Sequence, residues 1–299
     1  MPRCIAFLLL ILFSLAGWAE KHPAAIASAH PLATEAGFRI LEQGGNAFDA
    51  AVAVTAALAV VDPAGSGLGG GGFWLLHRAD DDFQVMIDGR EMAPGNAHAN
   101  MYLDENGQFQ ADLSLNGPLA AGIPGIPAGL VVLSRKYGVL PLATSLQPAI
   151  DYAEQGFDVT ESYQRLAGFR QQILNKYPET AAIFLDNGTL PEIGYRIRQP
   201  DLARTLKSIA LKGKAGFYQG EIARKLVRSV QKHGGIWTLD DLAAYQIKER
   251  QPVTGRYHDY RITSAALPSS GGIVLMLALN QLAEFNLLKA DNTQTRHWV

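Results

Sequence analysis

Cysteine is almost absent from this sequence of 299 residues, and its scarcity excludes several kinds of chemistry. The single cysteine, Cys4, lies in the apolar start of the chain, so no disulfide, thiol nucleophile or thiolate metal site is expected in the folded part. The seven histidines lack the spacing of metal ligands. We therefore expect no metal centre and no other cofactor, and a fold that is stable through its hydrophobic core alone.

An excess of one charge is also missing. The formal net charge is −2, and acidic and basic residues are interspersed. Because a nucleic-acid-binding protein normally carries a basic face, we expect no nucleic-acid partner. The one basic cluster, Arg224 to Lys232, shares its segment with apolar residues at helical spacing, which indicates a solvated helix face opposite a core face.

Long hydrophobic runs are missing except at the start of the chain. Arg3 supplies a positive charge, residues 4–15 are nearly all apolar, and Gly17 and Ala19 are the small residues that precede a signal-peptidase cut. We predict a signal peptide over residues 1–19, a mature chain over 20–299, and a periplasmic or secreted location. A membrane anchor is the alternative, but a span needs about 20 apolar residues, so we expect no stable membrane insertion after cleavage.

Apolar periodicity predicts a mixed protein of helices and strands. Gly44 and Gly45 should end the first helix, and Asn46 with Asp49 should cap the second. We expect helices over 32–41, 47–60, 130–137, 146–155, 202–211, 221–233, 240–245 and 274–282, and strands over 73–77, 83–87 and 257–264. Helices, then a hairpin, then mainly helices indicate the α/β (α+β) class, with an antiparallel sheet and not a doubly wound parallel one.

A glycine-rich segment fits the pattern of a dinucleotide-binding loop at Gly65, Gly67 and Gly70. That loop follows a strand and opens a helix, whereas here a predicted helix precedes the glycines and a predicted strand follows them. We therefore expect these glycines to allow two backbones to approach closely, or to form one wall of a cleft.

Arg90 is the candidate substrate-binding residue. It follows a strongly apolar strand, between Gly89 and Glu91, where a hairpin presents side chains at the edge of a cleft. A guanidinium there can hold a substrate carboxylate through two parallel hydrogen bonds. From spacing alone, a structural salt bridge is the competing interpretation. The segment 269–272 is similarly either a tight turn before a helix or a loop that lines a site.

Read together, several segments resemble the gamma-glutamyltranspeptidase family, also called glutathione hydrolases. Their order and spacing extend from about residue 24 to residue 290. The segments are His30-Pro31-Leu32-Ala33, Gly44-Gly45-Asn46-Ala47-Phe48-Asp49, Gly67-Leu68-Gly69-Gly70-Gly71-Gly72-Phe73, Asp88-Gly89-Arg90-Glu91-Met92-Ala93-Pro94, Gly122-Ile123-Pro124-Gly125, Lys136-Tyr137-Gly138, Pro148-Ala149-Ile150, Phe217-Tyr218-Gln219-Gly220, Asp241-Leu242-Ala243-Ala244-Tyr245 and Pro268-Ser269-Ser270-Gly271-Gly272.

The resemblance implies an N-terminal-nucleophile hydrolase fold, a four-layer αββα sandwich. It also implies a precursor that cuts itself, so that the new N-terminal threonine of a small subunit takes the gamma-glutamyl group from glutathione and passes it to water or an amino acid. Arg90 matches the position that binds the glutamyl α-carboxylate.

By the same resemblance, the sequence reaches Val299 before the threonine segment, so we assign no catalytic residue here. We expect an incomplete sandwich that needs the small subunit and is inactive alone. We interpret the sequence as part of the ordinary enzyme of this family. A related acylase or poly-gamma-glutamate hydrolase on the same scaffold and a truncated non-catalytic binding protein are the alternatives.

Overall fold

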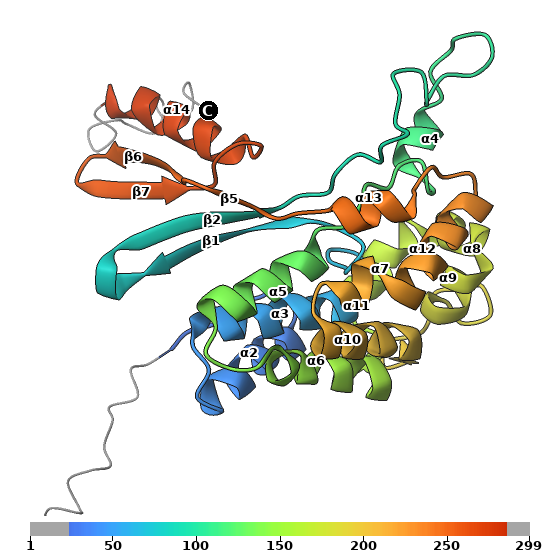
Figure 1. The fold of residues 1–299 in the computed structure, drawn as a ribbon, viewed down its shortest axis with the longest axis horizontal. Helices are drawn as coiled ribbons and strands as arrows, with labels where there is room; N and C mark the ends of the chain where they lie inside the picture. Colours follow the sequence, from blue (N-terminus) through green and yellow to red (C-terminus); the bar gives the residue numbers. More distant parts are fainter. Residues whose placement is uncertain (1–23, 286–299) are drawn as a thin grey trace, which may run out of the picture.

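A computed structural model describes residues 24–285 and shows a helical body packed on one side of a small antiparallel sheet (Figure 1). The predicted signal peptide lies outside the described residues. The helices are α2 (Pro31–Glu42), α3 (Ala47–Val61), α4 (Ala111–Leu115), α5 (Ile126–Tyr137), α6 (Leu142–Gln155), α7 (Glu161–Gly168), α8 (Gln171–Lys176), α9 (Pro178–Phe184), α10 (Pro200–Lys212), α11 (Ala215–Tyr218), α12 (Gly220–Lys232), α13 (Leu239–Ala244) and α14 (Gly271–Ala283). The strands are β1 (Gly72–Arg78), β2 (Phe83–Gly89), β3 (Phe157–Asp158), β4 (Arg196–Ile197), β5 (Lys248–Arg250), β6 (Val253–Tyr257) and β7 (Tyr260–Ser264).

The turn between α2 and α3 is fixed by the capping that the sequence predicts. Gly44 ends α2 with a φ of 88°, a conformation that glycine adopts without strain. Asn46 and Asp49 then form a reciprocal capping box at the start of α3. The buried Asp49 carboxylate also accepts hydrogen bonds from the backbone N–H groups of Val139 and Leu140. The same carboxylate therefore caps α3 and attaches the loop that precedes α6.

Helix α3 lies at the centre of the helical body. Its small alanine and valine side chains are buried and pack against α2, α5 and α6, and α10 packs against α6. Small side chains allow neighbouring helices to approach closely, which explains why this apolar helix is a core element. No helix within residues 24–285 is long and apolar enough to span a membrane.

The three-stranded sheet has the order β1-β2-β5, and both pairings are antiparallel. The hairpin between β1 and β2 was predicted, and Asp82 turns its tip with a φ of 50°. In the central strand β2, Asp88 is paired with Phe73 on one side and with Lys248 on the other. Arg90 follows the end of this central strand.

Some expectations need correction. The strand expected over 257–264 is instead the hairpin of β6 and β7, because His258 takes a φ of 49° and turns the chain. Helix α5 begins at Ile126, earlier than expected, because Pro127 is compatible with the first turn of a helix. Helices α4, α7 to α9 and α11 were not predicted, since helices of eight residues or fewer show little periodicity.

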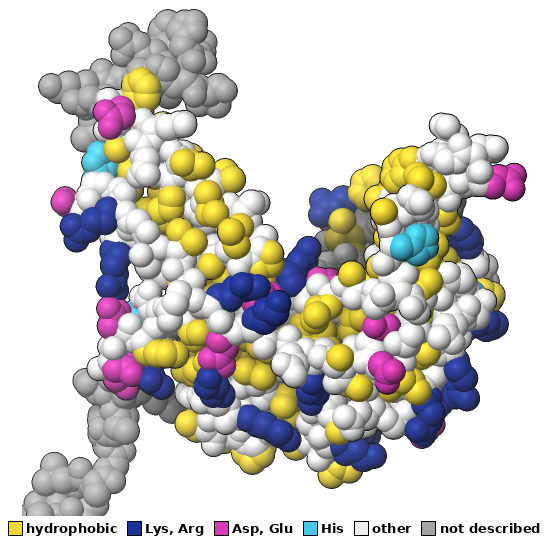
Figure 2. All heavy atoms as spheres, turned by 45° about the horizontal axis from the view of Figure 1, so that its top comes forward, with side chains coloured by type: hydrophobic (Ala, Val, Ile, Leu, Met, Phe, Trp, Pro, Cys, Tyr) yellow, Lys and Arg dark blue, Asp and Glu magenta, His cyan; other side chains and the backbone are white. Residues whose placement is uncertain are grey.

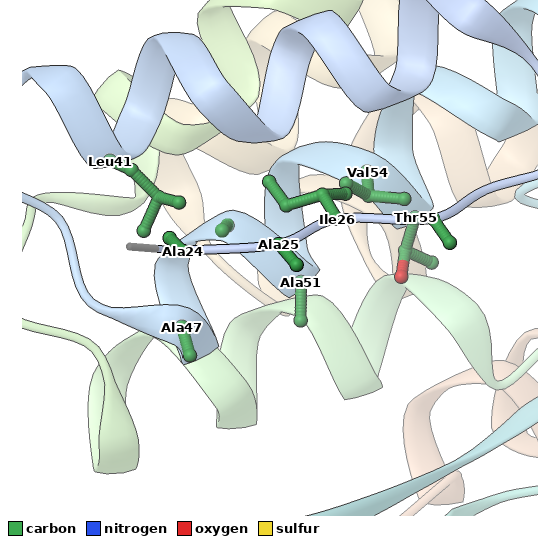
Figure 3. Close-up of a pocket in the computed structure, with 10 residues that line it drawn as sticks. Ala24, Ala25, Ile26, Leu41, Ala47, Ala51, Val54 and Thr55 are labelled. Atoms are coloured by element: carbon green, nitrogen blue, oxygen red, sulfur yellow. The ribbon is translucent and has the colours of Figure 1, made fainter. Parts of the chain in front are cut away.

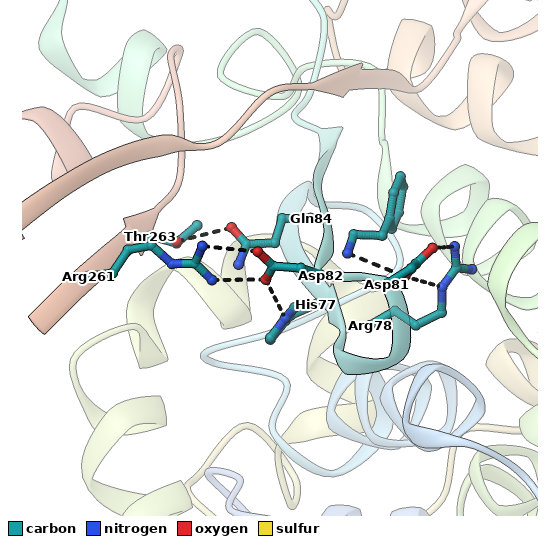
Figure 4. A network of polar contacts seen from close by, with 8 residues as sticks. His77, Arg78, Asp81, Asp82, Gln84, Arg261 and Thr263 are labelled. Carbon is teal, nitrogen blue, oxygen red and sulfur yellow. Dashed lines mark hydrogen bonds and ion pairs between the residues drawn. The ribbon is translucent and has the colours of Figure 1, made fainter.

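The hairpin of β6 and β7 is attached to the tip of the first hairpin by polar contacts (Figure 4). The Arg261 guanidinium donates hydrogen bonds of 2.9 and 3.0 Å to the two carboxylate oxygens of Asp82. The His77 ring lies 3.2 Å from the same carboxylate, and the Thr263 hydroxyl lies 3.1 Å from Gln84 Oε1. Helix α14 packs on β6 and β7 and completes a small unit, which we call the C-terminal unit (residues 253–283).

Candidate substrate-binding site

Arg90 lies at an open edge of the molecule. Its side chain is 58% exposed. Figure 2 shows this face hollowed between the side that carries α14 and the loop around α4, with charged side chains on the floor of the hollow. In Figure 1, the end of β2 lies between the same two parts. The guanidinium is therefore accessible to a ligand.

The backbone of Arg90 is held on both sides. Its N–H donates a hydrogen bond of 3.0 Å to Asp88 Oδ1, and its carbonyl accepts one of 2.8 Å from the Tyr245 hydroxyl. The nearly buried Asp88 carboxylate accepts a second hydrogen bond, of 2.7 Å, from Arg250 Nε on β5. The site thus combines a fixed backbone with an exposed side chain.

Among residues 24–285, the guanidinium of Arg90 has one charged partner, Glu91. Its Nη1 lies 3.2 Å from Oε2 of Glu91, whose side chain is partly exposed. The structural salt bridge that spacing left open is therefore present. A solvent-accessible pair of this kind contributes only about 0–1 kcal/mol to stability, so a ligand carboxylate can compete with Glu91 at small cost.

The glycine-rich segment allows backbones to approach closely around Arg90. The Gly70 carbonyl accepts hydrogen bonds from the N–H groups of Gly125 and Ile126. A Cβ at Gly71 would lie 2.5 Å from the Glu91 carboxylate, and one at Gly125 would lie 1.9 Å from the Gly89 carbonyl. A Cβ at Gly70 would meet no atom nearer than 3.6 Å, so the close approach that requires glycine is at Gly71. Helix α3 precedes the segment and β1 follows it, which is the reverse of a dinucleotide-binding loop.

A pair of tyrosines lies behind Arg90. The rings of Tyr218 and Tyr245 stack with centroids 5.4 Å apart and an interplanar angle of 7°. Burial raises the pKa of Tyr218, and burial together with the charges of Asp88 and Glu91 raises the pKa of Tyr245. Both hydroxyls therefore stay protonated at neutral pH. The Tyr218 hydroxyl donates to the Pro124 carbonyl at 2.7 Å.

Sequence reasoning did not find the role of Tyr245. Its hydroxyl contacts a residue 155 positions away in the chain, and no local pattern signals such a contact. The available signal was its place in the segment Asp241-Leu242-Ala243-Ala244-Tyr245, which contributed to the resemblance but had no assigned function.

Other candidate features lie apart from Arg90. A pocket of about 520 Å³ lies between residues 24–27 and helices α2 and α3 (Figure 3), and Thr55 supplies a hydroxyl to a mainly apolar lining. Ser270 directly precedes α14, which supports the interpretation of 269–272 as a turn before a helix. Among residues 24–285, no three histidine, cysteine or acidic side chains are grouped so as to hold a metal ion.

The basic cluster on α12 is a solvated face, as predicted. Arg224, Lys225, Arg228 and Lys232 are exposed, while Ala223 on the opposite face is buried. Lys225 also pairs with the exposed Glu221 one helical turn away, at 2.7 Å.

Comparison with known proteins gives consistent similarities. The family model described as gamma-glutamyltranspeptidase matches residues 33–299. The glutathione hydrolase proenzyme of Escherichia coli (strain K12) is 42% identical over 265 residues, which are 88% of this chain and 46% of that protein. The glutathione hydrolase proenzyme of Bacillus subtilis (strain 168) is 40% identical over 276 residues, which are 91% of this chain and 46% of that protein. The chain thus spans about half the length of the curated relatives it matches.

Solved structures give a similar result. The gamma-glutamyltranspeptidase of Helicobacter pylori is 40% identical with a TM-score of 0.86, and the match covers 91% of this chain and 78% of that chain. The cephalosporin acylase of Bacillus halodurans is 29% identical with a TM-score of 0.80, and the match covers 94% of this chain and 55% of that chain.

Proposed function

Because this chain belongs to the gamma-glutamyltranspeptidase family, we propose that it is the substrate-holding portion of an enzyme that removes the gamma-glutamyl group from glutathione-like substrates. The enzyme passes that group to water or to an amino acid. The observation that carries the proposal is the accessible guanidinium of Arg90 at the end of β2, within the residues that the family model matches.

Arg90 has the chemistry that a gamma-glutamyl donor requires. The donor carries its α-carboxylate on the α-carbon, at the end of the glutamyl group that is remote from the γ-amide that is cut. A planar guanidinium binds such a carboxylate through two parallel hydrogen bonds, which fixes its orientation as well as its position. Anchoring the remote carboxylate then places the amide at a set distance from Arg90, where a nucleophile can attack it.

We place the nucleophile on a threonine that begins a small subunit cut from the same precursor. Curated relatives are named proenzymes, and this chain spans about half their length. An N-terminal threonine can attack an amide because its own amine serves as the base. The chain of residues 1–299 is therefore inactive without that subunit.

The C-terminal unit offers a surface for the small subunit. Helix α14 is strongly apolar, yet Ile273, Val274, Leu275 and Leu277 are all exposed. Contiguous apolar patches on a soluble protein commonly mark an interface. We assign this face to the small subunit, which would bury it.

Export completes the proposal. Removal of residues 1–19 would release the mature chain, with Glu20 first, into the periplasm or the medium. Mass spectrometry of the exported protein tests this directly, and a membrane-bound product that retains Met1 would contradict it.

An acylase with a different substrate is the second candidate. It is favoured by the similarity to the cephalosporin acylase, which extends over nearly the whole chain. A panel of glutathione, poly-gamma-glutamate and β-lactam amides separates the two. It is given to the proposed precursor that includes the small subunit, which we call the full-length protein. The proposal expects glutathione to be cleaved with the highest kcat/KM.

Substitution of Arg90 in the full-length protein tests the binding role. Arg90→Ala removes the charge, and Arg90→Lys keeps the charge but loses the paired geometry. Hydrogen bonds to a charged group contribute about 1.5–3 kcal/mol, so kcat/KM for glutathione should fall about ten- to hundredfold. Arg224→Ala, at an exposed arginine on α12, is the matched control and should leave kcat/KM unchanged. Unchanged hydrolysis in both Arg90 variants would show that another residue binds the carboxylate.

A further inference from the structure

We infer that Tyr245 and the Asp88–Arg250 pair are positioning residues that fix the backbone of Arg90 and so aim its guanidinium at the substrate. The inference rests on the proposed carboxylate-binding role of Arg90. We call these three side chains, of Asp88, Tyr245 and Arg250, the clamp. Asp88 and Tyr245 form hydrogen bonds to the Arg90 backbone, and Arg250 forms one to Asp88, so none of them needs to touch the substrate.

The clamp holds both polar groups of a single residue. Asp88 accepts from the Arg90 N–H at 3.0 Å, and Tyr245 donates to the Arg90 carbonyl at 2.8 Å. The only soft backbone dihedrals at a residue are φ and ψ, so holding the groups on either side of Cα restricts both of them. The direction of the Cα–Cβ bond of Arg90 is thereby set.

The clamp is built from segments that are far apart in the sequence. Tyr245 directly follows α13 and leads into β5, and β5 supplies Arg250, whose Nε donates to Asp88 at 2.7 Å. Tyr218 stacks on Tyr245 from α11, and the ammonium of Lys214 donates to the Tyr245 carbonyl. Tyr245 therefore has its ring, its carbonyl and its hydroxyl all engaged, which leaves it little freedom to move.

This arrangement matters because the Arg90 side chain has little other support. It is mostly exposed, and within the described part of the chain its one charged partner is the partly exposed Glu91. A guanidinium on a mobile backbone would bind the carboxylate in several orientations, and a misplacement of about 1 Å can reduce a catalysed rate about a hundredfold. The clamp removes that freedom before the substrate arrives.

Tyr245→Phe in the full-length enzyme is the direct test. It keeps the ring stacked on Tyr218 and removes the hydroxyl that holds the Arg90 carbonyl. Loss of one hydrogen bond predicts a fall in kcat/KM of about three- to tenfold for a gamma-glutamyl anilide, mainly through a higher KM. The 4-aminobutyryl anilide, which lacks the α-carboxylate, should be affected less. The preference for the carboxylate-bearing substrate should therefore shrink, and it should not shrink further when Tyr245→Phe is added to Arg90→Ala.

Tyr163→Phe is the matched control. The Tyr163 hydroxyl is also buried, donates to a backbone carbonyl at 2.6 Å, and has a pKa that burial raises to about 12. That carbonyl belongs to Phe184, at the end of α9. The variant should lose comparable thermal stability and keep the full preference for the α-carboxylate.

A second variant, Arg250→Met, approaches the clamp from the side of Asp88 and serves if Tyr245→Phe does not fold. Loss of carboxylate preference in either variant, with the preference kept in Tyr163→Phe, supports the inference. If Arg90→Ala abolishes the preference but Tyr245→Phe and Arg250→Met retain it, the inference is wrong and the proposed function stands. If Arg90→Ala itself retains the preference, the proposed function is wrong.

Discussion

The helical body and the C-terminal unit use apolar residues in opposite ways. In the body, α3 is surrounded by α2, α5 and α6, and its alanines and valines are buried. In the C-terminal unit, α14 is similarly apolar, but Gly272 is its one buried residue within Gly271–Ala283. Two strongly apolar helices thus have very different surroundings. An apolar helix lowers the free energy of folding only when another surface covers it.

The difference indicates which part of the chain is self-sufficient. The helical body covers its apolar core with its own helices. The C-terminal unit is attached to the β1–β2 hairpin partly by exposed polar contacts such as Arg261 with Asp82. Exposed ion pairs contribute little to stability. We therefore expect the body to determine the stability of the chain, and the C-terminal unit to depend on a partner.

Matched leucine substitutions should show the largest difference between the body and the C-terminal unit. Leu130 in α5 is 0% exposed and Leu277 in α14 is 57% exposed. Leu130→Ala should lower the free energy of unfolding of the chain by about 2–5 kcal/mol, because it removes buried contacts and leaves a cavity. Leu277→Ala should change it by less than about 0.5 kcal/mol. Urea denaturation measures both values.

The leucine pair also gives a sharper form of the test. In the full-length protein, Leu277→Ala should weaken association with the small subunit if that subunit covers α14. If Leu277→Ala changes the free energy of unfolding equally with and without the small subunit, the assignment of this face as an interface is wrong.

Two capping boxes, Asn46 with Asp49 at the start of α3 and Thr238 with Asp241 at the start of α13, provide a second matched pair. Asp49→Ala removes a buried acceptor that serves Asn46 and the loop at Val139 and Leu140, so we expect a loss of about 3 kcal/mol. Asp241→Ala removes a less buried cap, which accepts from Thr238 and Gly95, and should cost about 1 kcal/mol. Equal losses, measured by the same urea titration, would show that the buried box does not stabilise the body more strongly than the partly exposed one.

Much of the fold could be predicted because its signals are local. The two capping boxes, the glycine stop after α2 and the β1–β2 hairpin each depend on residues within a few positions of one another. The comparisons confirm the mixed α/β class and the N-terminal-nucleophile hydrolase type of fold. The β6–β7 hairpin was missed because its turn uses His258 and Asp259 in place of the usual glycine.

The candidate site could be predicted only in part. Spacing identified Arg90 but could not separate a carboxylate-binding residue from a salt bridge, and the structure shows an ion pair with Glu91. The hydrogen bond from the Tyr245 hydroxyl to the Arg90 carbonyl joins two segments that are far apart in the sequence. Such contacts arise from tertiary packing, which leaves no periodic pattern in the chain.

A smaller effect concerns the start of the helical body. His30 caps α2 by accepting a hydrogen bond from the Leu32 N–H, and burial lowers its pKa from 6.5 although the charge of Asp62 opposes the shift. Above pH 6.5 the ring is neutral in both states, so stability should not change there. As the pH falls below that value, the unfolded chain takes up the proton first and the folded state loses stability. His30→Asn keeps a capping acceptor but removes the titrating ring. The melting temperature of this variant should therefore depend less on pH between pH 7 and pH 5 than that of the unsubstituted chain.

The central claim is that this chain holds a gamma-glutamyl substrate and needs a partner for the chemistry. The most direct measurement is the release of the aniline from a gamma-glutamyl anilide by the purified 299-residue chain, alone and after co-expression with a matching small subunit of the family. The account predicts no turnover above a heat-killed control for the chain alone, and turnover sensitive to Arg90→Ala when the small subunit is present. Turnover by the chain alone that is lost on Arg90→Ala would contradict it, because a nucleophile would then lie within these residues.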